Sequence, residues 1–348
     1  MLQPGAGPIR ADVYLPADPA RLFWGRLPCA ADEPVLEVDP GVEVTIDTLS
    51  HEGLLDDQGS DPAAYFGRFG VQGVLEDAIA LAATRTRGVD DGPHVVTGPV
   101  RVRGARPGDV LSVRIVELLP RVPYGVISNR HGRGALPGEY PLGGESVSVF
   151  ARADGDEGVI DRSSGGPAQQ ARFPLAPFLG LIGVAAPGDQ RPHSVPPDLF
   201  GGNIDINLLT AGATLHLPVL ADGALAYVGD PHFAQGDGEV ALTAFEASLR
   251  ATVRFDLVPA ADPFARFVQE FGPVAETDAL LCPTGLDPDL REAMKKAVRA
   301  SIAYLTTLHG FDHEHAYAYL SAATDFRISQ VVDQTTGVHA TIRKADLA

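Results

Sequence analysis

The segment GDPHFAQGDGEV, residues 229–240, combines acidic side chains, a histidine and a glutamine with three glycines. In an extended chain, side chains two positions apart point the same way, so Asp230 and His232 share one face, as do Asp237 and Glu239. Carboxylate oxygens and imidazole nitrogens form the ligand sets of hydrolytic zinc sites and related divalent centres. Surface turns also collect acids and glycines, so a solvated turn is the alternative interpretation of this segment alone.

A second segment upstream, FGGNIDINLLTAG, has a similar composition. Asn203, Asp205 and Asn207 occupy alternate positions and are separated by the apolar Ile204 and Ile206, which predicts a polar face beside a buried one. Asn and Asp also cap turns and bind backbone amides, so a structural role is the alternative for this segment.

Histidines elsewhere in the chain are candidates to complete a metal site. His51 follows a predicted strand in VTIDTLSHEG, and His94 begins another in HVVTGPV. Each is also compatible with a solvated or structural role. His216 alternates with Thr214 in TLHLPV and is predicted to be a partly buried strand residue. The DHEH run at 312–315 is predicted to begin a helix, where rings two positions apart cannot share a face.

The composition describes a globular, strongly acidic chain. Of its 348 residues 45% are hydrophobic, and Asp plus Glu outnumber Lys plus Arg by 45 to 27, for a net charge of −18. This charge disfavours binding to nucleic acid or to an anionic membrane. Because the sequence offers neither a signal-peptide core nor a membrane span, we expect a cytoplasmic protein. Cys29 and Cys282 have no metal-binding spacing and are expected to be free thiols.

Short strands and tight turns dominate the expected architecture. The chain holds 38 glycines and 29 prolines and few helical periodicities. Apolar and polar residues alternate within 42–46, 111–115 and 249–257, as in half-buried strands. The predicted fold class is β-rich α+β, with mostly antiparallel sheets in a sandwich-like or barrel-like arrangement and a few helices. We expect one intertwined domain over residues 1–348, with a surface loop or linker at 161–177.

Three helices are predicted. The clearest lies near the C-terminus, where Asp287 is the N-cap, Pro288 takes the first position and Gly310 ends the apolar stripe. A second helix is expected from about 312 to 323, and a third in the latter half of 63–88.

Five segments together resemble the acetamidase/formamidase family in their order and spacing. They cover most of residues 95–343 and read TGPVRVRGARPGDVL, FPLAPFLGLIGVA, GGNIDINLLTAGATLHLPV, GALAYVGDPHFAQGDGEV and DFRISQVVD. The resemblance implies a metal-dependent hydrolase of small linear amides on a strand-rich, usually oligomeric fold. Residues 1–94 match weakly. The segments SHEGLLDDQGSDPAAYFGRFG and SNRHGRGALPGEY depart from the common family forms, so we expect them to shape the substrate pocket.

The resemblance also transfers two motifs to numbered positions. The family's acidic motif falls on Asp230, His232, Gln235, Asp237 and Glu239, and its paired-glycine motif falls on Gly201, Gly202, Asn203 and Asp205. With the resemblance, a functional site becomes the preferred interpretation of both segments.

Hydrolysis of an unactivated amide needs a nucleophile, a group that stabilises the oxyanion and a proton donor for the amine. A divalent metal, zinc or alternatively calcium, is expected to supply the first two. The candidate metal ligands are Asp205, Asp230, His232, Glu239, His51 and His94. Glu239 is either a ligand or the general base, and Asp237 is the rival base. Gln235 or Asn203 is expected to donate to the oxyanion or to orient the amide.

Other mechanisms and one other class of protein stay open. A cysteine amidase is disfavoured, because Cys282 has an apolar approach and no nearby base in sequence. A serine amidase would use Ser163 or Ser164 in DRSSGGPAQQ, although the lysines all lie beyond residue 290. A non-catalytic module that binds a small amide or a sugar is the competitor from another class. The expected partners are a small amide substrate and further copies of the chain; Asp47 and Asp56 are weaker site candidates.

Overall fold

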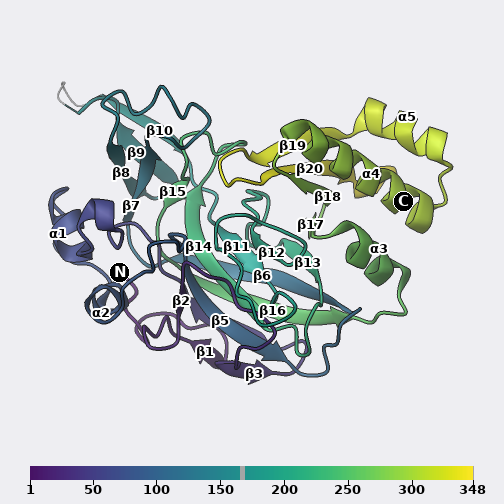
Figure 1. Cartoon of the computed structure of the whole chain (residues 1–348), viewed down its shortest axis with the longest axis horizontal. Coiled ribbons are helices and arrows are strands. Elements are labelled where there is room, and N and C mark those ends of the chain that lie inside the picture. The colour runs from purple at the N-terminus through teal and green to yellow at the C-terminus, as the bar shows by residue number, and fades with distance from the viewer. Residues whose placement is uncertain (165–168, 348) are drawn as a thin grey trace.

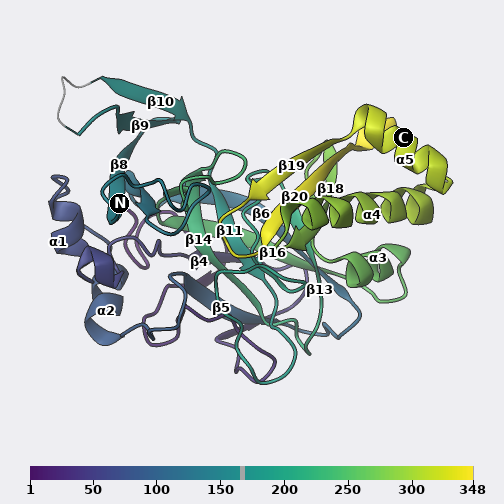
Figure 2. The same ribbon diagram turned by 45° about the horizontal axis from the view of Figure 1, so that its top comes forward.

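A computed structural model describes residues 1–164 and 169–347. Two large sheets make up most of the molecule, and the helices lie at its two ends (Figure 1). The helices α3, α4 and α5 gather with the C-terminal strands at one end, whereas α1 and α2 lie at the opposite end. The β8–β10 strands project away from the body, as the turned view also shows (Figure 2).

Nine strands form the first sheet. In spatial order they are β1 (Val13–Leu15), β4 (Glu43–Asp47), β16 (Leu249–Val258), β6 (Val110–Pro120), β13 (Thr214–Pro218), β17 (Val274–Glu276), β18 (Leu280–Asp287), β20 (Thr336–Arg343) and β19 (Asp325–Gln330). The β1–β4 pair is parallel. The other neighbouring pairs are antiparallel.

Eleven strands form the second sheet. Its main path runs β10 (Gln170–Pro174), β9 (Glu157–Asp161), β8 (Ser146–Asp154), β7 (Tyr124–Arg130), β15 (Phe245–Glu246), β14 (Ala226–Ala234), β11 (Phe178–Gly183) and β12 (Gly201–Asn203). The long strand β14 also pairs with β5 (Val95–Val102), which in turn pairs with β2 (Phe23–Trp24) and β3 (Leu36–Val38). Strand β14 therefore lies among three partners, and it is the strand that carries Asp230 and His232.

The predicted fold class is confirmed, because strands dominate and nearly all of their pairings are antiparallel. One cluster of buried apolar side chains includes Val44 and Val113 from the first sheet together with Leu181 and Val228 from the second. The two sheets therefore share a core, as in a sandwich. None of the described helices is long and apolar enough to cross a membrane.

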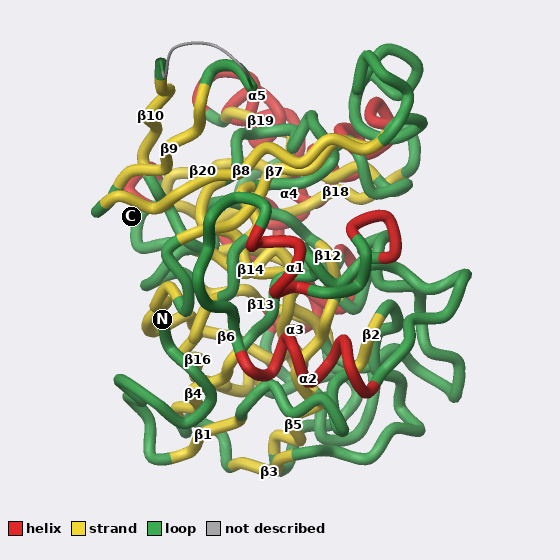
Figure 3. Tube along the Cα trace, turned by 90° about the vertical axis from the view of Figure 1, so that its left-hand side faces the viewer, coloured by secondary structure: helices red, strands yellow, loops and turns green. Residues whose placement is uncertain are grey.

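The helices are short except for one. They are α1 (Pro62–Gly67), α2 (Glu76–Thr84), α3 (Pro263–Phe271), α4 (Leu290–His309) and α5 (His313–Ala323), with 3-10 turns at Asp56–Gln58 and Lys344–Asp346. The helices predicted at 312–323 and in the latter half of 63–88 are confirmed as α5 and α2. The views in Figures 1 and 3 place α1 and α2 together on one side of the molecule.

The predicted start of the long C-terminal helix is wrong by two residues. Asp289 is the N-cap, because its side chain accepts hydrogen bonds from the amides of Arg291 and Glu292 at 2.8 and 3.1 Å. Asp287 instead ends β18, where it pairs with Thr336 of β20. The predicted end at Gly310 is confirmed, and this glycine has a φ of 70°.

Two further helices escaped prediction, although each begins with a recognisable cap. Asp61 precedes Pro62 in α1 and accepts a hydrogen bond from the Ala64 amide. Asp262 precedes Pro263 in α3 and accepts a hydrogen bond from the Phe264 amide. An acidic N-cap followed by proline is a common helix start. Both helices are short, so the apolar period that reveals a helix has too few turns to stand out.

The predicted alternation in β4 is only half right. Val44 and Ile46 face the core, but Thr45 and Asp47 on the other face are buried as well. The hydroxyls of Thr45 and Thr252 lie 3.0 Å apart, and Arg250 binds Asp47 on that face. A polar strand face is therefore covered by polar partners rather than by water.

The segment predicted as a loop or linker at 161–177 lies partly in a hairpin. Strand β9 ends at its first residue, and β10 lies within it; the two strands pair antiparallel, with Gln170 opposite Asp161. Ser163 and Ser164 lie in the exposed connection between them, whereas Gly165 and Gly166 lie outside the described residues.

Candidate active site and metal centre

A cluster of buried histidines and carboxylates lies around the end of β14. Asp230 and His232 come from β14 itself, and Glu246 comes from the neighbouring β15, where it is paired with His232. His51 follows β4 and His94 directly precedes β5. The two sheets therefore bring residues from four separate parts of the sequence to one place.

Three of the acids adopt a backbone conformation that L-residues rarely take. Asp205, Asp230 and Glu239 have φ values of 49°, 48° and 46°. Such left-handed residues cost about 1–3 kcal/mol each and persist where the surrounding structure enforces them, often at functional sites. The backbone turns at these positions and directs the carboxylates into the cluster.

Gly180 of β11 leaves the space in which the cluster forms. It lies opposite Asp230, and its carbonyl accepts the amide of Asp205 at 3.1 Å. A Cβ at this position would meet His232 Cε1 at 2.6 Å and Asp230 Oδ2 at 2.9 Å, and it would also collide with Asp205. Any other residue at position 180 would therefore occupy the space between the side chains of Asp205, Asp230 and His232.

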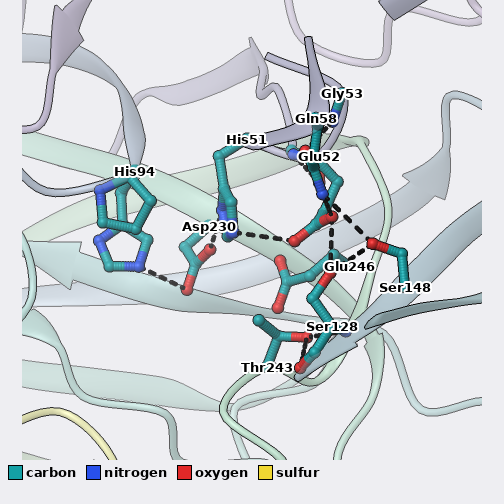
Figure 4. A network of polar contacts seen from close by, with 12 residues as sticks. His51, Glu52, Gly53, Gln58, His94, Ser128, Ser148, Asp230, Thr243 and Glu246 are labelled. Atoms are coloured by element: carbon teal, nitrogen blue, oxygen red, sulfur yellow. Dashed lines mark hydrogen bonds and ion pairs between the residues drawn. The ribbon is translucent and has the colours of Figure 1, made fainter. Parts of the chain in front are cut away.

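His51, His94 and Asp230 form one three-residue group. Asp230 Oδ1 lies 3.5 Å from His51 Nδ1, and Asp230 Oδ2 lies 3.7 Å from His94 Nε2. The two imidazole rings stand edge to face with their centroids 5.5 Å apart. Figure 4 shows both rings turned toward the carboxylate of Asp230. One potential ligand atom from each residue falls within a sphere that a single cation could bridge.

Two further groups overlap with the first. His232 Nε2 lies 3.1 Å from Asp230 Oδ2 and 3.0 Å from Glu246 Oε1, which defines a group of Asp230, His232 and Glu246. The third group combines Asp205, His232 and Glu239. Because they share Asp230 and His232, the three groups form one continuous cluster.

Several polar atoms of this cluster lack hydrogen-bond partners within the described residues. Buried polar groups in folded proteins are nearly always paired, so each exception calls for an explanation. The unpartnered atoms here are His51 Nδ1, Asn203 Oδ1, both oxygens of Asp205, Asp230 Oδ1, both ring nitrogens of His232 and Glu246 Oε2. Such a convergence of nitrogen and carboxylate oxygen fits a divalent cation, which would satisfy several of these atoms at once.

The electrostatics of the buried acids and of His94 also fit a cation. Burial raises the pKa values of Asp205 and Glu239 well above the ordinary range, and neighbouring carboxylates raise them further. Burial raises the pKa of Asp333 to about 7. Burial also lowers the pKa of His94 to about 4, so its ring is neutral at physiological pH and has a free electron pair for a metal. Crowded, desolvated acids of this kind are a recurrent feature of functional sites.

A second set of buried contacts fixes the rings of His51 and His94. Glu52 Oε1 lies 3.4 Å from His51 Nε2, which leaves Nδ1 for the cluster. The other oxygen of Glu52 accepts a hydrogen bond from Ser128 at 2.8 Å and from Gln58 (Figure 4). His94 Nδ1 lies 3.0 Å from the hydroxyl of Ser194, which leaves Nε2 for Asp230. Carboxylate and hydroxyl partners of this kind orient metal-binding histidines in many proteins.

The cluster opens into a cleft of about 670 Å³. Its floor includes His51, His94, Asp230, Glu239 and Glu246, together with Asn203 and Asp333. The segments 51–57 and 130–137 contribute much of the remaining wall. Both belong to the two segments that depart from the family's common forms, and they line this cleft; that they shape a substrate pocket stays a prediction.

The structure does not bring every predicted site residue to the cluster. Asp237 is exposed and binds Arg327 at 2.6 and 2.9 Å, so the prediction that it shares a face with Glu239 is wrong. The positive φ of Glu239 turns its side chain inward, whereas that of Asp237 stays outside. Gln235 donates hydrogen bonds to the carbonyl oxygens of Asp205 and Ser329, and it therefore supports the loop behind the site.

The regular alternation predicted for Asn203, Asp205 and Asn207 also ends at the turn. Asn203 is buried and lines the cleft, and Asp205 lies in the cluster behind it. Asn207 instead donates to the Gln235 carbonyl and to Asp237. The change of direction at Asp205, with its φ of 49°, separates the last asparagine from the first two residues.

Three buried acids of the site were not identified from the sequence. Glu246 stands between Phe245 and Ala247 in a mostly apolar run, and a lone buried acid in such a run is a recognisable signal. Glu52 follows His51 directly, and Asp333 ends the DFRISQVVD segment. Nothing local marks these two, because their partners come from distant strands.

The remaining nucleophile and acid candidates lie elsewhere. Cys282 is buried within β18, and burial raises its pKa to about 12, so it is a thiol. Ser163 and Ser164 lie in the exposed β9–β10 connection. His216 is a strand residue, as predicted, but it is buried rather than partly buried, and it lies between Ser112 and Glu276. Asp56 is exposed on the cleft rim.

Comparisons with known proteins agree with the resemblance seen in the sequence. The sequence profile described as the Acetamidase/Formamidase family matches residues 188–343. An acetamidase of Mycolicibacterium smegmatis is 29% identical over 212 residues, which is 46% of this chain and 52% of that protein. The chain thus spans about half the length of this relative. The resemblance to the acetamidase/formamidase family is confirmed.

Solved structures extend the likeness to the whole fold. A crystal structure of an acetamidase from Bacillus halodurans has a TM-score of 0.74 at 24% identity, covering 96% of this chain and 98% of that chain. A crystal structure of an acetamidase from Yersinia enterocolitica has a TM-score of 0.75 at 24% identity, and the match covers 99% of this chain and 96% of that chain. Both likenesses include the N-terminal residues, which match the family weakly in sequence.

Proposed function

We propose that this protein hydrolyses the C–N bond of a small linear amide of the formamide or acetamide type to a carboxylate and ammonia, with a bound divalent cation. One observation carries the proposal: His51, His94 and Asp230 converge, buried and incompletely hydrogen-bonded, on the floor of an open cleft. The names of the matched relatives support the choice of an amide substrate.

His51, His94 and Asp230 would hold the cation, because all three line the cleft and so leave room for a substrate beside it. Two nitrogens and a carboxylate are the ligand set of catalytic zinc, whereas calcium prefers oxygen ligands throughout. Zinc is therefore the proposed ion. The predicted ligands His232 and Asp205 do not line the cleft and would support Asp230 from behind.

When bound, a divalent cation lowers the pKa of water toward neutrality and polarises a carbonyl group. Glu246 is the proposed general base. It lines the cleft, it lies in one cluster with Asp230 and His232, and burial raises its pKa. It would take a proton from the attacking water and return it to the departing nitrogen. Glu239, which also lines the cleft, is the alternative base, and Asn203 would orient the amide.

The test combines metal analysis with ammonia release from formamide and acetamide. We expect about one equivalent of metal per chain in the purified protein, and turnover that a chelator abolishes and zinc restores. His94→Ala removes one proposed ligand and should lower both metal content and turnover by more than about a hundredfold. His313→Ala, on the exposed start of α5, is the matched control and should change neither.

Turnover by protein free of metal would contradict the mechanism and return attention to a serine nucleophile. Metal retained without turnover of any amide would favour a binding module on the same scaffold. The homo-oligomer and the cytoplasmic location remain predictions; sedimentation of the purified protein and cell fractionation test them.

A further inference from the structure

The two ends of the cleft differ in charge. Its floor is acidic, with Asp230, Glu239, Glu246 and Asp333 all buried there. Its mouth carries the arginines Arg87, Arg130 and Arg133 and the half-buried His193. The mouth therefore offers positive charge to an anionic group of an entering ligand.

The acids at the mouth are already paired with arginines. Asp57 binds Arg130 at 2.7 Å, and Asp91 binds Arg26 at 2.6 Å. Asp56 lies 3.5 Å from Arg87. Their charges are thus matched within the protein.

Arg133 differs from the other arginines of the mouth. Its guanidinium makes no hydrogen bond and no ion pair with any described residue, and it is exposed. Arg133 and His193 both line the cleft, where burial lowers the pKa of His193 and the cations Arg26 and Arg133 lower it further. Among the arginines that line the cleft, Arg87 and Arg130 form ion pairs with acids, whereas Arg133 forms none with a described residue.

The cleft is large enough for a substrate that extends beyond a small amide. About 670 Å³ lies within the range of roughly 300–1,000 Å³ that proteins use for drug-sized ligands. Formamide or acetamide would fill only a small part of it, next to the floor. The space between the floor and Arg133 is available to a further part of the substrate.

We infer that the natural substrate is a primary amide that also carries a carboxylate, with its amide at the acidic floor and its carboxylate on Arg133. This inference rests on the proposed function for the reaction, but its binding step does not depend on turnover. A guanidinium presents two parallel N–H groups that match a carboxylate, and Arg133 has these groups free.

The test compares two probes of the same shape. Succinamate carries a carboxylate beside its primary amide, and succinamide replaces that carboxylate with a second amide. We expect wild-type kcat/KM to favour succinamate by about fivefold at low salt, since partly exposed ion pairs of this type have modest strength. The preference should shrink as ionic strength rises. Arg133→Gln should remove it, whereas Arg291→Gln, an exposed arginine on α4 away from the cleft, should leave it unchanged.

Binding of both probes, measured by calorimetry, separates this inference from the proposed function. Hydrolysis of both amides at equal rates, unchanged in Arg133→Gln, would overturn the carboxylate inference and leave the amidase intact. Tighter binding of succinamate that is lost in Arg133→Gln, without turnover of any amide, would support carboxylate binding by Arg133 and overturn the amidase. Equal, weak binding of both probes without turnover would overturn both.

Discussion

Two buried charged clusters lie in this molecule, and they differ in how their charges are matched. In the first, Asp47 on β4 accepts hydrogen bonds from Arg250 at 2.6 and 3.0 Å and from Tyr14 at 2.5 Å. In the second, Asp230 has only histidine and carboxylate neighbours, and one of its oxygens has no hydrogen bond with any described residue. Both aspartates are almost completely buried.

The difference separates a structural role from a functional one. Arg250 also donates to the backbone oxygens of Gln3, Ala6 and Pro8, so the Asp47 cluster fastens the N-terminal segment to the first sheet. The Asp230 cluster fastens nothing of this kind: its acids outnumber its cations and face a cleft. Burial alone therefore does not identify a site; the added signal is that several buried atoms without hydrogen bonds converge beside a cleft.

The largest effect on stability is expected from Arg250→Met. The change leaves the Asp47 carboxylate buried without its main partner and frees the N-terminal carbonyl groups, which should lower the free energy of unfolding by about 3–5 kcal/mol. Denaturant unfolding measures this. Metal content per folded molecule should not change. A loss below about 1 kcal/mol would mean that the Asp47 cluster does not hold the fold.

Gly180→Ala should affect mainly the other cluster. The added Cβ would displace His232, Asp230 and Asp205, so metal affinity should fall by about a hundredfold while the fold survives with a loss of about 1–3 kcal/mol. Titration with zinc checks this. Gly67→Ala is the control, because a Cβ there meets no described atom within 4 Å. Unchanged zinc affinity would mean that the space beside Gly180 is not needed for metal binding.

Removal of the metal should destabilise the protein by a moderate amount. A ligand that binds only the folded state at a hundred times its Kd contributes about 2.7 kcal/mol. A chelator should therefore lower Tm by roughly 4 °C in the wild type, but not in a variant that lacks a proposed ligand, such as His94→Ala. Thermal scans with and without chelator measure the shift. An equal shift in both proteins would place the metal elsewhere.

The smallest effect concerns a matched pair outside both clusters. The hydrogen bond from His216, with help from Lys344, lowers the pKa of Glu276 from 4.5 to about 2. Because the folded pKa lies below the unfolded one, this contribution is full above about pH 5 and is lost as the pH falls toward 2. Glu276→Gln should cost about 1 kcal/mol at pH 6 and almost nothing near pH 2. A difference in the free energy of unfolding between wild type and Glu276→Gln that stays constant with pH would contradict this.

The fold was largely predictable because its signals are local. Alternation revealed strands such as β6 and β16, and an apolar stripe that ends at Gly310 revealed α4, although its N-cap was misplaced. The same local signals failed on β4, where Thr45 and Asp47 resemble a solvent face but are buried under Arg250 and its neighbours. The residues that cover them are distant in the sequence, and no pattern within β4 reveals them.

The candidate site was predictable in part for the same reason. Asp230 and His232 lie two apart in β14, so spacing alone brought them together. Spacing misplaced Asp237, because the left-handed backbone at Glu239 reverses the expected direction. Glu246 and Glu52 meet the cluster only through strand pairing and loop packing, which single-sequence periodicity does not encode.

The most direct test of the account applies one chemical change to both clusters and measures metal content and ammonia release per folded molecule. Asp230→Asn keeps the size of the side chain and suits its left-handed φ, so the variant should fold but lose its metal and more than about a hundredfold in turnover. Asp47→Asn should lose stability but keep metal and turnover in each folded molecule. If Asp230→Asn retained metal and turnover, or Asp47→Asn lost both while folded, the division between the two clusters would be wrong.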